Sequence, residues 1–337
     1  MAMSEFWAGK RVAVTGCAGF LGSHLARALV DRGASVLGLD IVSDSPCWRV
    51  HGLSGVAELT RCNIFDRNNL LFHLDPDRFR PESHPAPRAE IVFHLAGVSG
   101  IHEAQRDAVR AFEVNTRAAW MLLDVCQELG VKATVLASSN HVYGSRASAH
   151  SEGEACQATD VYGLSKGAQD FVARAFGGKG VPVATLRHVN CFGPADPHES
   201  HIVTGAVLSV LAGKAPTVRS DGTPIKAYLH VADVVAAYLL LAETLARGGI
   251  LFGEAFNCAP RAPISALALV DKIIVLAGLD LVPDVLSEDL TQSGYVEILD
   301  ASRLRRLGWE PHWSLEEGLM DTLTWYREHK GMEWLTS

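Results

Sequence analysis

The feature that most constrains the fold is a glycine-rich turn directly after a short apolar run near the N-terminus. Residues Arg11 to Thr15 lead into Gly16-Cys17-Ala18-Gly19-Phe20-Leu21-Gly22, and helical periodicity follows. These glycines permit a tight turn, close approach of the backbone to a pyrophosphate, and close packing of helix on strand. Backbone N–H groups and the helix N-terminus then face the anion. We therefore expect a dinucleotide site that includes Gly16, Gly19, Phe20, Leu21 and Gly22.

The first half of the chain alternates short β-branched runs with segments of helical period, which is typical of a parallel sheet covered by helices. The predicted strands are Arg11 to Thr15, Ser35 to Asp40, Glu90 to Leu95, Thr134 to Ser138 and Val181 to Arg187. The predicted helices are Leu21 to Arg32, Ala104 to Leu129 and Tyr162 to Phe176. The fold class expected is α/β, a Rossmann-type doubly wound parallel sheet.

A carboxylate at the end of the second predicted strand indicates which dinucleotide is bound. Asp40 follows the glycines by roughly 20 residues, where this fold binds the adenosine ribose hydroxyls. Its charge would repel a 2′-phosphate, so NAD is favoured over NADP; a surface Asp that caps the next loop is the alternative. Asn63 and Ile64 follow the next short segment, where an amide could bind the adenine amino group.

The second half of the chain is expected to form a smaller lobe. The alternation weakens after Gly193, and the remaining predicted helices are Val203 to Leu211, Ala232 to Leu245 and Ser265 to Leu276. We expect an NAD-binding domain over residues 1–193 and mainly a substrate-binding lobe over 194–337, with some elements returning to the first domain. Four prolines predict an exposed, irregular connection over Asp75 to Arg88.

Charge and composition exclude several classes of partner. The net charge of -8, without a dense Lys/Arg run, would repel a nucleic-acid backbone. Seven dispersed cysteines without a C-x-x-C pair fit a reducing compartment. The N-terminus lacks the pattern of a leader, and the most apolar stretch, Val234 to Ala242, is too short to span a bilayer. We expect a cytoplasmic protein without nucleic-acid or membrane partners.

A serine, a tyrosine and a lysine form the candidate catalytic set. Tyr162 and Lys166 lie four residues apart and hence on one helix face. A neighbouring ammonium and a positive nicotinamide ring would favour the phenolate, so Tyr162 could act as a base. Taken alone, this pair is more often a solvated helix pair. Ser139, however, follows a predicted strand at the sheet edge where open α/β sheets bind ligands.

Together these motifs resemble the extended short-chain dehydrogenase/reductases, specifically the nucleotide-sugar epimerases and dehydratases. The resemblance covers nearly the whole chain. It includes the glycine turn, His94-Leu95-Ala96-Gly97, Asn115, Ser138-Ser139, Tyr162 with Lys166, Arg187 to Pro194, Lys226 to Val234 and Ser302 to Trp309.

The resemblance implies a role for each matched residue. Leu95, Ala96, Gly97 and Asn115 belong to the cofactor site. Ser139 binds the reacting hydroxyl, Tyr162 is the general base, and Lys166 holds the nicotinamide ribose and lowers the tyrosine pKa. Asn190 contacts the substrate diphosphate, and Lys226 stands where the family usually has an Arg. The family also implies a homodimer packed through the helices that contain Asn115 and Tyr162.

Departures from the family pattern narrow the expected reaction. Dehydratases follow the catalytic Ser/Thr with Asp-Glu, whereas this chain has Asn140-His141, so 4,6-dehydration is disfavoured. GDP-fucose synthases, which are epimerases and reductases, have an acid/base Cys at that Glu position and an acid/base His that matches His201. His141 and His201 could move protons on two faces of a sugar, or could be structural. We expect a redox-neutral enzyme, most simply an epimerase.

Three other interpretations stay open at this stage. The usual diphosphate-binding Arg is missing from Thr291 to Val296, and Ser-Ser-Asn-His also resembles uronate dehydrogenases, so a net dehydrogenase of a sugar or sugar acid is the first rival. An NAD-binding sensor or scaffold is the second, against which the intact Ser139, Tyr162 and Lys166 argue. A metal at His198, Glu199 and His201 is the third; no cysteine cluster accompanies them, and we expect none.

Overall fold

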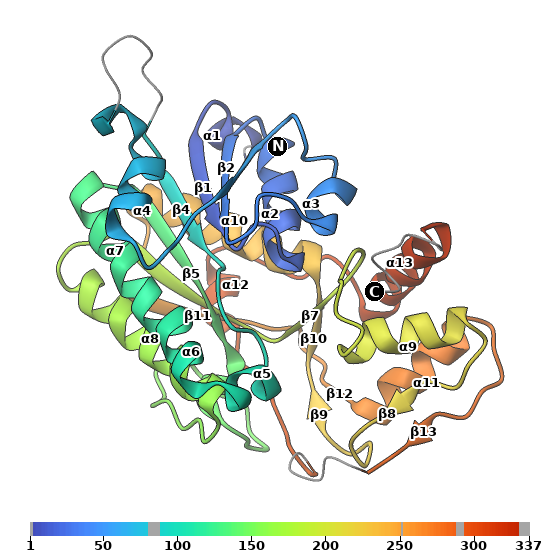
Figure 1. The fold of residues 1–337 in the computed structure, drawn as a ribbon. Coiled ribbons are helices and arrows are strands. Elements are labelled where there is room, and N and C mark those ends of the chain that lie inside the picture. Colours follow the sequence, from blue (N-terminus) through green and yellow to red (C-terminus); the bar gives the residue numbers. More distant parts are fainter. Residues whose placement is uncertain (1–2, 80–87, 251, 288–292, 330–337) are drawn as a thin grey trace. The chain divides into compact units, whose positions relative to one another are not determined.

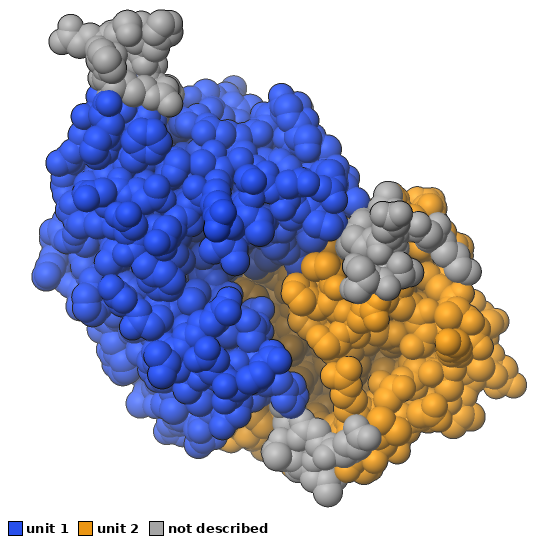
Figure 2. Space-filling view, viewed as in Figure 1, with its two compact units in different colours: residues 1–144, 152–187, 235–256 blue, residues 145–151, 188–234, 257–337 orange. Residues whose placement is uncertain are grey.

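The chain forms two compact units whose segments interleave along the sequence. The computed structural model describes residues 3–79, 88–250, 252–287 and 293–329. Unit 1 comprises residues 1–144, 152–187 and 235–256, and unit 2 comprises 145–151, 188–234 and 257–337 (Figure 2). The domain boundary predicted after residue 193 stays a prediction.

Unit 1 is built on a seven-stranded sheet with the order β11-β6-β5-β4-β1-β2-β3 (Figure 1). The pairs β1–β2, β2–β3, β1–β4 and β4–β5 are parallel. Its strands are β1 (Arg11–Thr15), β2 (Ser35–Asp40), β3 (Glu58–Arg61), β4 (Ile91–His94), β5 (Ala133–Ser139), β6 (Val183–His188) and β11 (Glu254–Cys258). The predicted Rossmann-type α/β class is therefore confirmed.

Helices cover both faces of this sheet. They are α1 (Met3–Trp7), α2 (Phe20–Val30), α3 (Pro46–Val50), α4 (Arg67–Leu74), α5 (Ile101–Arg106), α6 (Ala108–Phe112), α7 (Ala118–Leu129), α8 (Val161–Gly177) and α10 (Val231–Ala246), which begins in unit 2. Val92 packs with α4 and α7 in one cluster. The next residue, Phe93, contacts Trp7 and Tyr238 of α10. Alternating side chains of β4 thus fill the cores on the two faces.

The carboxyl ends of the central strands meet at one edge of the sheet. Thr15 of β1 pairs in register with Leu39 of β2 and His94 of β4, and His94 pairs with Leu136 of β5. The glycine turn, Asp40, the loop after His94 and Ser139 consequently all leave the sheet at this edge. This is where open α/β sheets bind their ligands.

The long helix predicted from Ala104 to Leu129 is not one α-helix. Asp107 has φ -140° and ψ 82°, so α5 ends there and α6 begins. A π-helical turn, η2 (Glu113–Arg117), then joins α6 to α7. The continuous prediction was wrong at these points because Asp107 favours capping a helix over continuing one: its side chain accepts a hydrogen bond from the Arg110 N–H.

Among the other predicted elements, the strands at Arg11 to Thr15 and Ser35 to Asp40 have the predicted bounds, and the rest shift by one or two residues at their ends; several elements were missed. Strand β3 has exposed ends, and β11 contains Glu and Asn, so neither reads as an apolar run. Within the predicted irregular connection, Pro76–Phe79 forms a 3₁₀ helix, η1, and residues 80–87 lie outside the described residues. A second 3₁₀ helix, η3 (Asn140–Tyr143), follows β5.

Unit 2 consists of short two-stranded sheets and helices around its own apolar core. The elements are β7 (Asn190–Phe192) with β10 (Tyr228–His230), β9 (Ile225–Lys226) with β12 (Ile264–Ser265), β8 (Thr217–Val218) with β13 (Asp284–Val285), and the helices α9 (Ile202–Leu211), α11 (Ala266–Leu276), α12 (Ser302–Arg306) and α13 (Leu315–Glu328). Helices α9, α11 and α13 supply most of that core. None of the helices in the described part of the chain is long and apolar enough to cross a bilayer.

Candidate active site

The glycine turn is shaped by close backbone contacts that exclude side chains. Gly16 has φ 69°, and a Cβ built on it would lie 2.5 Å from the Ala96 N atom. A Cβ on Gly22 would overlap the Gly16 carbonyl. Helix α2 starts at Phe20, and its N-cap, Gly19, places no side chain over the first turn. The N–H groups at the start of α2 are thus left open to an anion.

Asp40 is tied to this turn by a direct hydrogen bond. One carboxylate oxygen accepts from the Ala18 N–H at 3.0 Å, and the other accepts from the Ile41 N–H at 2.7 Å. Asn63 follows β3, and its side-chain oxygen accepts from the Phe65 N–H at 3.1 Å, while Ile64 beside it is buried. A cradle that a Cβ would fill, an open helix start and a carboxylate beside them fit NAD, which Gly16 to Gly22, Asp40 and the loop after β4 would hold.

The loop Leu95-Ala96-Gly97 is fixed from inside the sheet. The Thr15 hydroxyl lies 2.7 Å from His94 Nδ1 and accepts a hydrogen bond from the Ala96 N–H at 3.2 Å. His94 is fully buried, and burial together with the nearby charge of Lys166 lowers its pKa to about 3. His94 is therefore neutral at physiological pH and acts as a support for the loop.

Asn115 is a buried link between that loop and helix α8. Its side-chain oxygen accepts from the Val98 N–H at 2.9 Å. Its nitrogen donates to the Val98 carbonyl at 3.2 Å and to Ser165 Oγ at 2.9 Å. Ser165 Oγ in turn donates to the Tyr162 carbonyl at 2.8 Å. The π turn that contains Asn115 thus fixes the position of the segment that carries Tyr162 and Lys166.

Ser139 and His141 lie where β5 passes into η3. Ser139 is buried, its hydroxyl lies 3.2 Å from Asn140 Oδ1, and it accepts from the His141 N–H as the cap of η3. The His141 ring lies edge-on to the Tyr162 ring with 5.6 Å between centroids. Its Nδ1 lies 4.0 Å from a carboxylate oxygen of Asp160, the residue that caps α8. The structure therefore places His141 next to the candidate base.

Lys166 is buried beneath the same loop, and its charge is held by two acceptors. Its Nζ donates to the Ala137 carbonyl at 2.8 Å and to Gln169 Oε1 at 3.2 Å. A Cβ on Gly97 would lie 2.9 Å from Asn115 Oδ1 and 3.2 Å from this Nζ, so a larger residue would have to displace these side chains. Burial lowers the pKa of Lys166 to about 8, although the charge of Asp170 opposes part of that effect. The lysine is mostly charged at neutral pH.

A buried ion pair connects the two segments that carry the catalytic set. Arg187 of β6 donates from Nε to Asp170 of α8 at 2.7 Å, and from a terminal nitrogen to the hydroxyl of Tyr143 in η3 at 2.5 Å. Burial opposes the charge of Arg187, but Asp170 and Tyr143 more than compensate and raise its pKa. Arg187 thereby ties helix α8 to the turn after Ser139.

The predicted substrate residues Asn190 and Lys226 belong to unit 2. Asn190 Nδ2 lies 3.4 Å from the Ala227 carbonyl and 3.5 Å from Oε1 of Glu297, which is buried. Lys226 Nζ lies 5.4 Å from the centroid of the Tyr295 ring, a cation–π contact. An acidic residue therefore lies beside the position predicted to bind a diphosphate.

His201 is anchored on a buried carboxylate in unit 2. Its Nδ1 lies 2.7 Å from Asp196 Oδ2, His198 Nδ1 lies 3.0 Å from Oδ1, and the Thr204 hydroxyl donates to Oδ2 at 3.0 Å. Burial alone would raise the pKa of Asp196, but these hydrogen bonds lower it well below its usual range. Asp196, not Glu199, completes the group with two histidines. The His198 and His201 rings stack with 4.8 Å between centroids, and each ring bonds a different carboxylate oxygen of Asp196.

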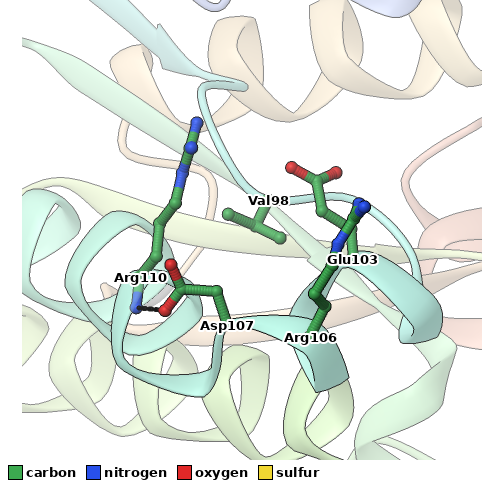
Figure 3. A pocket seen from close by; sticks show the side chains of 5 residues that line it. All are labelled: Val98, Glu103, Arg106, Asp107 and Arg110. Atoms are coloured by element: carbon green, nitrogen blue, oxygen red, sulfur yellow. Dashed lines mark hydrogen bonds between the residues drawn. The ribbon is translucent and has the colours of Figure 1, made fainter.

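A pocket of about 280 Å³ opens beside the loop after β4 in unit 1 (Figure 3). It is lined by Val98, Glu103, Arg106, Asp107 and Arg110. Figure 3 shows Val98 between Arg110 on one side and Glu103 with Arg106 on the other. None of the charged lining residues was selected from the sequence, because nothing in their spacing identifies a site.

The structure brings together the unit 1 residues of the predicted set. Gly16 contacts the backbone of Ala96, Gly97 contacts Asn115 and Lys166, and Tyr162 contacts His141. Asn190, Lys226 and His201 are placed only within unit 2. Sequence reasoning missed Gln169 and the ion pair of Asp170 with Arg187. Asp160 carried a signal, since an Asp immediately before a helix is a usual N-cap.

Comparison with known proteins places these observations in context. Residues 12–259 match the NAD dependent epimerase/dehydratase family. The chain is 28% identical to the CDP-glucose 4,6-dehydratase of Salmonella typhimurium over 96% of this chain and 92% of that protein. The UDP-glucose 4-epimerase of Thermotoga maritima, solved with UDP-glucose, has a TM-score of 0.83 and 27% identity over 95% of this chain and 99% of that one. MoeE5, solved with UDP-glucuronic acid and NAD, has a TM-score of 0.78 and 26% identity over 95% and 99%.

Proposed function

The chain belongs to the NAD-dependent epimerase/dehydratase family, and from this premise we propose that it modifies a nucleotide sugar by transient oxidation of a hydroxyl, most simply as an epimerase. The membership confirms the resemblance to extended short-chain dehydrogenase/reductases that the motifs indicated. NAD is the cofactor of this family, and several similar solved structures hold it. When bound, it supplies the hydride acceptor for oxidation of the hydroxyl and the hydride donor for reduction of the resulting carbonyl.

The observation that carries the proposal is the environment of Lys166. A buried ammonium four residues after Tyr162, held by Ala137 and Gln169, keeps a positive charge near the phenol. That charge favours the phenolate, so Tyr162 takes the proton from the substrate hydroxyl and later returns it. Ser139, buried at the end of β5, donates a hydrogen bond to the same substrate oxygen.

The substrate would be held by residues of unit 2 and oriented by histidines. Asn190 and Lys226 bind the diphosphate, and His141 and His201 exchange protons at the sugar. His141 is supported in this role by its contact with Tyr162 and by Asp160, and His201 by Asp196, which fixes the ring through Nδ1. Dehydration is the alternative that the Salmonella typhimurium relative supports, but Asn140-His141 replace the Asp-Glu of that reaction.

Replacing Tyr162 by Phe tests the mechanism directly. The ring and its contacts remain while the acid/base oxygen is lost, so turnover should fall roughly 10²- to 10⁴-fold with NAD affinity unchanged. Ser139→Ala should be harmful but milder. Near-normal turnover of Tyr162→Phe, measured by product analysis, would reject this mechanism for any substrate.

Deuterium incorporation and NADH formation distinguish the possible reactions. An epimerase forms no net NADH, whereas a dehydrogenase forms one equivalent per product, and a 4,6-dehydratase gives a deoxy keto sugar. We expect no net NADH and an epimerised product. Because His141 exchanges a proton at the sugar, turnover in D2O should place deuterium in the product. The product formed by His141→Ala should lack that deuterium. Stoichiometric NADH from a sugar acid would overturn the epimerase assignment but not the fold or cofactor.

We also propose that the protein is a homodimer. Large apolar side chains are exposed on the two helices expected to pack across the dimer: Trp120 on α7 is 52% exposed, and Leu164 and Phe171 on α8 are 47% and 59% exposed. Such a face is usually covered in an oligomer. Phe171→Glu should give a monomer in light scattering, while an exposed charge reversal in unit 2, Lys214→Glu, should not.

A cytoplasmic location is proposed from the cysteines. All seven are free thiols, and burial raises the pKa of several of them, among them Cys62, to about 12. Free thiols of this kind persist in a reducing compartment. The absence of secretion, checked by fractionation of the source cells, would agree with this proposal.

A further inference from the structure

The pocket beside the loop after β4 has the features of a binding site for an anion. Two guanidinium groups, those of Arg106 and Arg110, line a volume of about 280 Å³ together with Val98, Glu103 and Asp107 (Figure 3). Glu103 and Asp107 balance the formal charge of the two arginines, so binding of an anion depends on what each charged group contacts.

The break in the helix brings the two arginines to the same pocket. Arg106 is the last residue of α5 and Arg110 lies in α6, with the non-helical Asp107 between them. The carboxylate of Asp107 is engaged as the cap of α6, where it accepts from the Arg110 backbone N–H at 2.9 Å. It is therefore used by the backbone of Arg110, while the guanidinium of Arg110 extends away from it (Figure 3).

Neither guanidinium forms a hydrogen bond or ion pair with any residue that the structure describes. Other arginines of unit 1 behave differently. Arg67 pairs with Asp124 and Glu128, and Arg117 pairs with Glu113. Arginines favour planar anions that accept two parallel hydrogen bonds, such as a carboxylate. The two groups in the pocket retain this capacity for a ligand.

Val98 connects the pocket to helix α8, which carries Tyr162 and Lys166. It is buried, and it lies in a small apolar cluster with Ala104 and Ala111, against which the Tyr162 ring packs. Its backbone N–H and carbonyl are both held by Asn115. One residue thus forms the wall of the pocket on one side and belongs to the cluster around the candidate base on the other.

The geometry points to a sugar acid as the substrate, with its carboxylate bound by Arg106 and Arg110. This inference rests on the proposed function and specifies its substrate class. Glu103, which also lines the pocket, would accept a hydrogen bond from a neighbouring hydroxyl and would disfavour a second anion. A neutral hexose offers a hydroxymethyl group at that position and leaves both guanidiniums without a partner.

Two ligands that differ only at this group provide the test. Calorimetry on the NAD-loaded full chain compares UDP-glucuronate with UDP-glucose, and free glucuronate with free glucose. The acid should bind at least about 10-fold more tightly, since hydrogen bonds between charged groups are worth that factor or more. Arg106→Gln and Arg110→Gln should each reduce the ratio toward one, and Glu103→Gln should increase it. Arg219→Gln, an exposed arginine of unit 2, is the control and should leave the ratio unchanged.

The outcomes distinguish this inference from the proposed function. Equal binding of acid and neutral sugar, binding of neither, or a ratio unaffected by both arginine variants overturns the carboxylate site. Loss of both ligands to the same extent would show that the arginines bind the shared diphosphate, and also overturns it. If the neutral sugar is turned over and Tyr162→Phe abolishes that turnover, the proposed function stands without the inference. NAD affinity of every variant reports that it is folded.

Discussion

The glycine turn and the catalytic set are both at the same sheet edge, but they are held in place in different ways. The turn depends on backbone against backbone: Gly16 lies against Ala96, and Gly22 against Gly16. The catalytic set depends on buried polar side chains, among them Gln169 of the same helix and Arg187 of β6. The first arrangement is steric and depends on backbone atoms alone, some of them from the loop after β4. The second is assembled by tertiary structure, and a change far from Tyr162 can disturb it.

The largest effect should come from breaking the ion pair that supports the catalytic set. Arg187→Met leaves the carboxylate of Asp170 buried without its partner, which should cost about 3–5 kcal/mol in the free energy of unfolding. Denaturant titration measures this loss. The double variant Arg187→Met with Asp170→Leu should recover much of it, because no charge remains buried. A single variant as stable as the original chain would show that the set does not depend on this pair.

A smaller but still large effect is expected in the turn. Gly22→Ala places a methyl group against the Gly16 carbonyl, and such overpacking costs roughly 1–3 kcal/mol and should weaken NAD binding. Thermal unfolding and calorimetry with NAD report the two effects. The matched control is Gly153→Ala, since no atom lies within 4 Å of a Cβ there. Equal behaviour of the two variants would contradict the steric account.

Replacing Gln169 tests whether this side chain supports the charge of Lys166 or only the fold. Gln169→Leu removes one acceptor from the Lys166 ammonium, so the pKa of Lys166 should fall below its value of about 8. Activity needs the charged lysine, and the alkaline limb of the pH–rate profile should therefore move to lower pH, with a loss of about 1 kcal/mol in transition-state stabilisation at neutral pH. The exposed Gln127→Leu should leave the profile unmoved. A lower rate with an unchanged limb would indicate a merely structural role.

The smallest effect concerns the side chain that joins the glycine turn. Asp40→Asn keeps an oxygen for the Ala18 N–H but removes the charge, so the preference for NAD over NADP should shrink by about 1 kcal/mol or less. Asp40→Ala should also weaken NAD itself, since the turn loses that hydrogen bond. Competition binding with the two dinucleotides measures both. An unaltered protein that binds NAD and NADP equally would contradict the role of Asp40.

Much of the fold could be predicted because its signals are local. A strand, three glycines and a helix occur within a few residues, and β1, β2 and β5 read directly as apolar runs. Strands β3 and β11 could not be found in that way, since the one has exposed ends and the other carries polar residues. The break at Asp107 was missed because apolar periodicity continues across it.

The site was predictable only as far as its residues touch reacting groups or match a family motif. Ser139, Tyr162 and Lys166 have a spacing with a chemical reason. Gln169, the pairing of Arg187 with Asp170 and the pocket arginines depend on contacts that the fold alone creates, so one sequence offers no signal for these contacts. His201 was selected, but its partner Asp196 was not, because a carboxylate five residues away in a loop has no fixed direction.

The π turn at Glu113–Arg117 sets how far α6 and Asn115 are rotated about the helix axis relative to α7. A π turn contains one residue more than an α turn, and one residue corresponds to about 100° of rotation about a helix axis. Deleting a single residue from this stretch would turn Asn115 and everything before it by about that angle relative to α7. The fold of α7 would tolerate such a deletion, yet the link from Asn115 to Val98 would point elsewhere. The number of residues in this turn therefore sets the orientation of Asn115, and a homologous sequence one residue shorter or longer at this point could not replace it without moving Asn115.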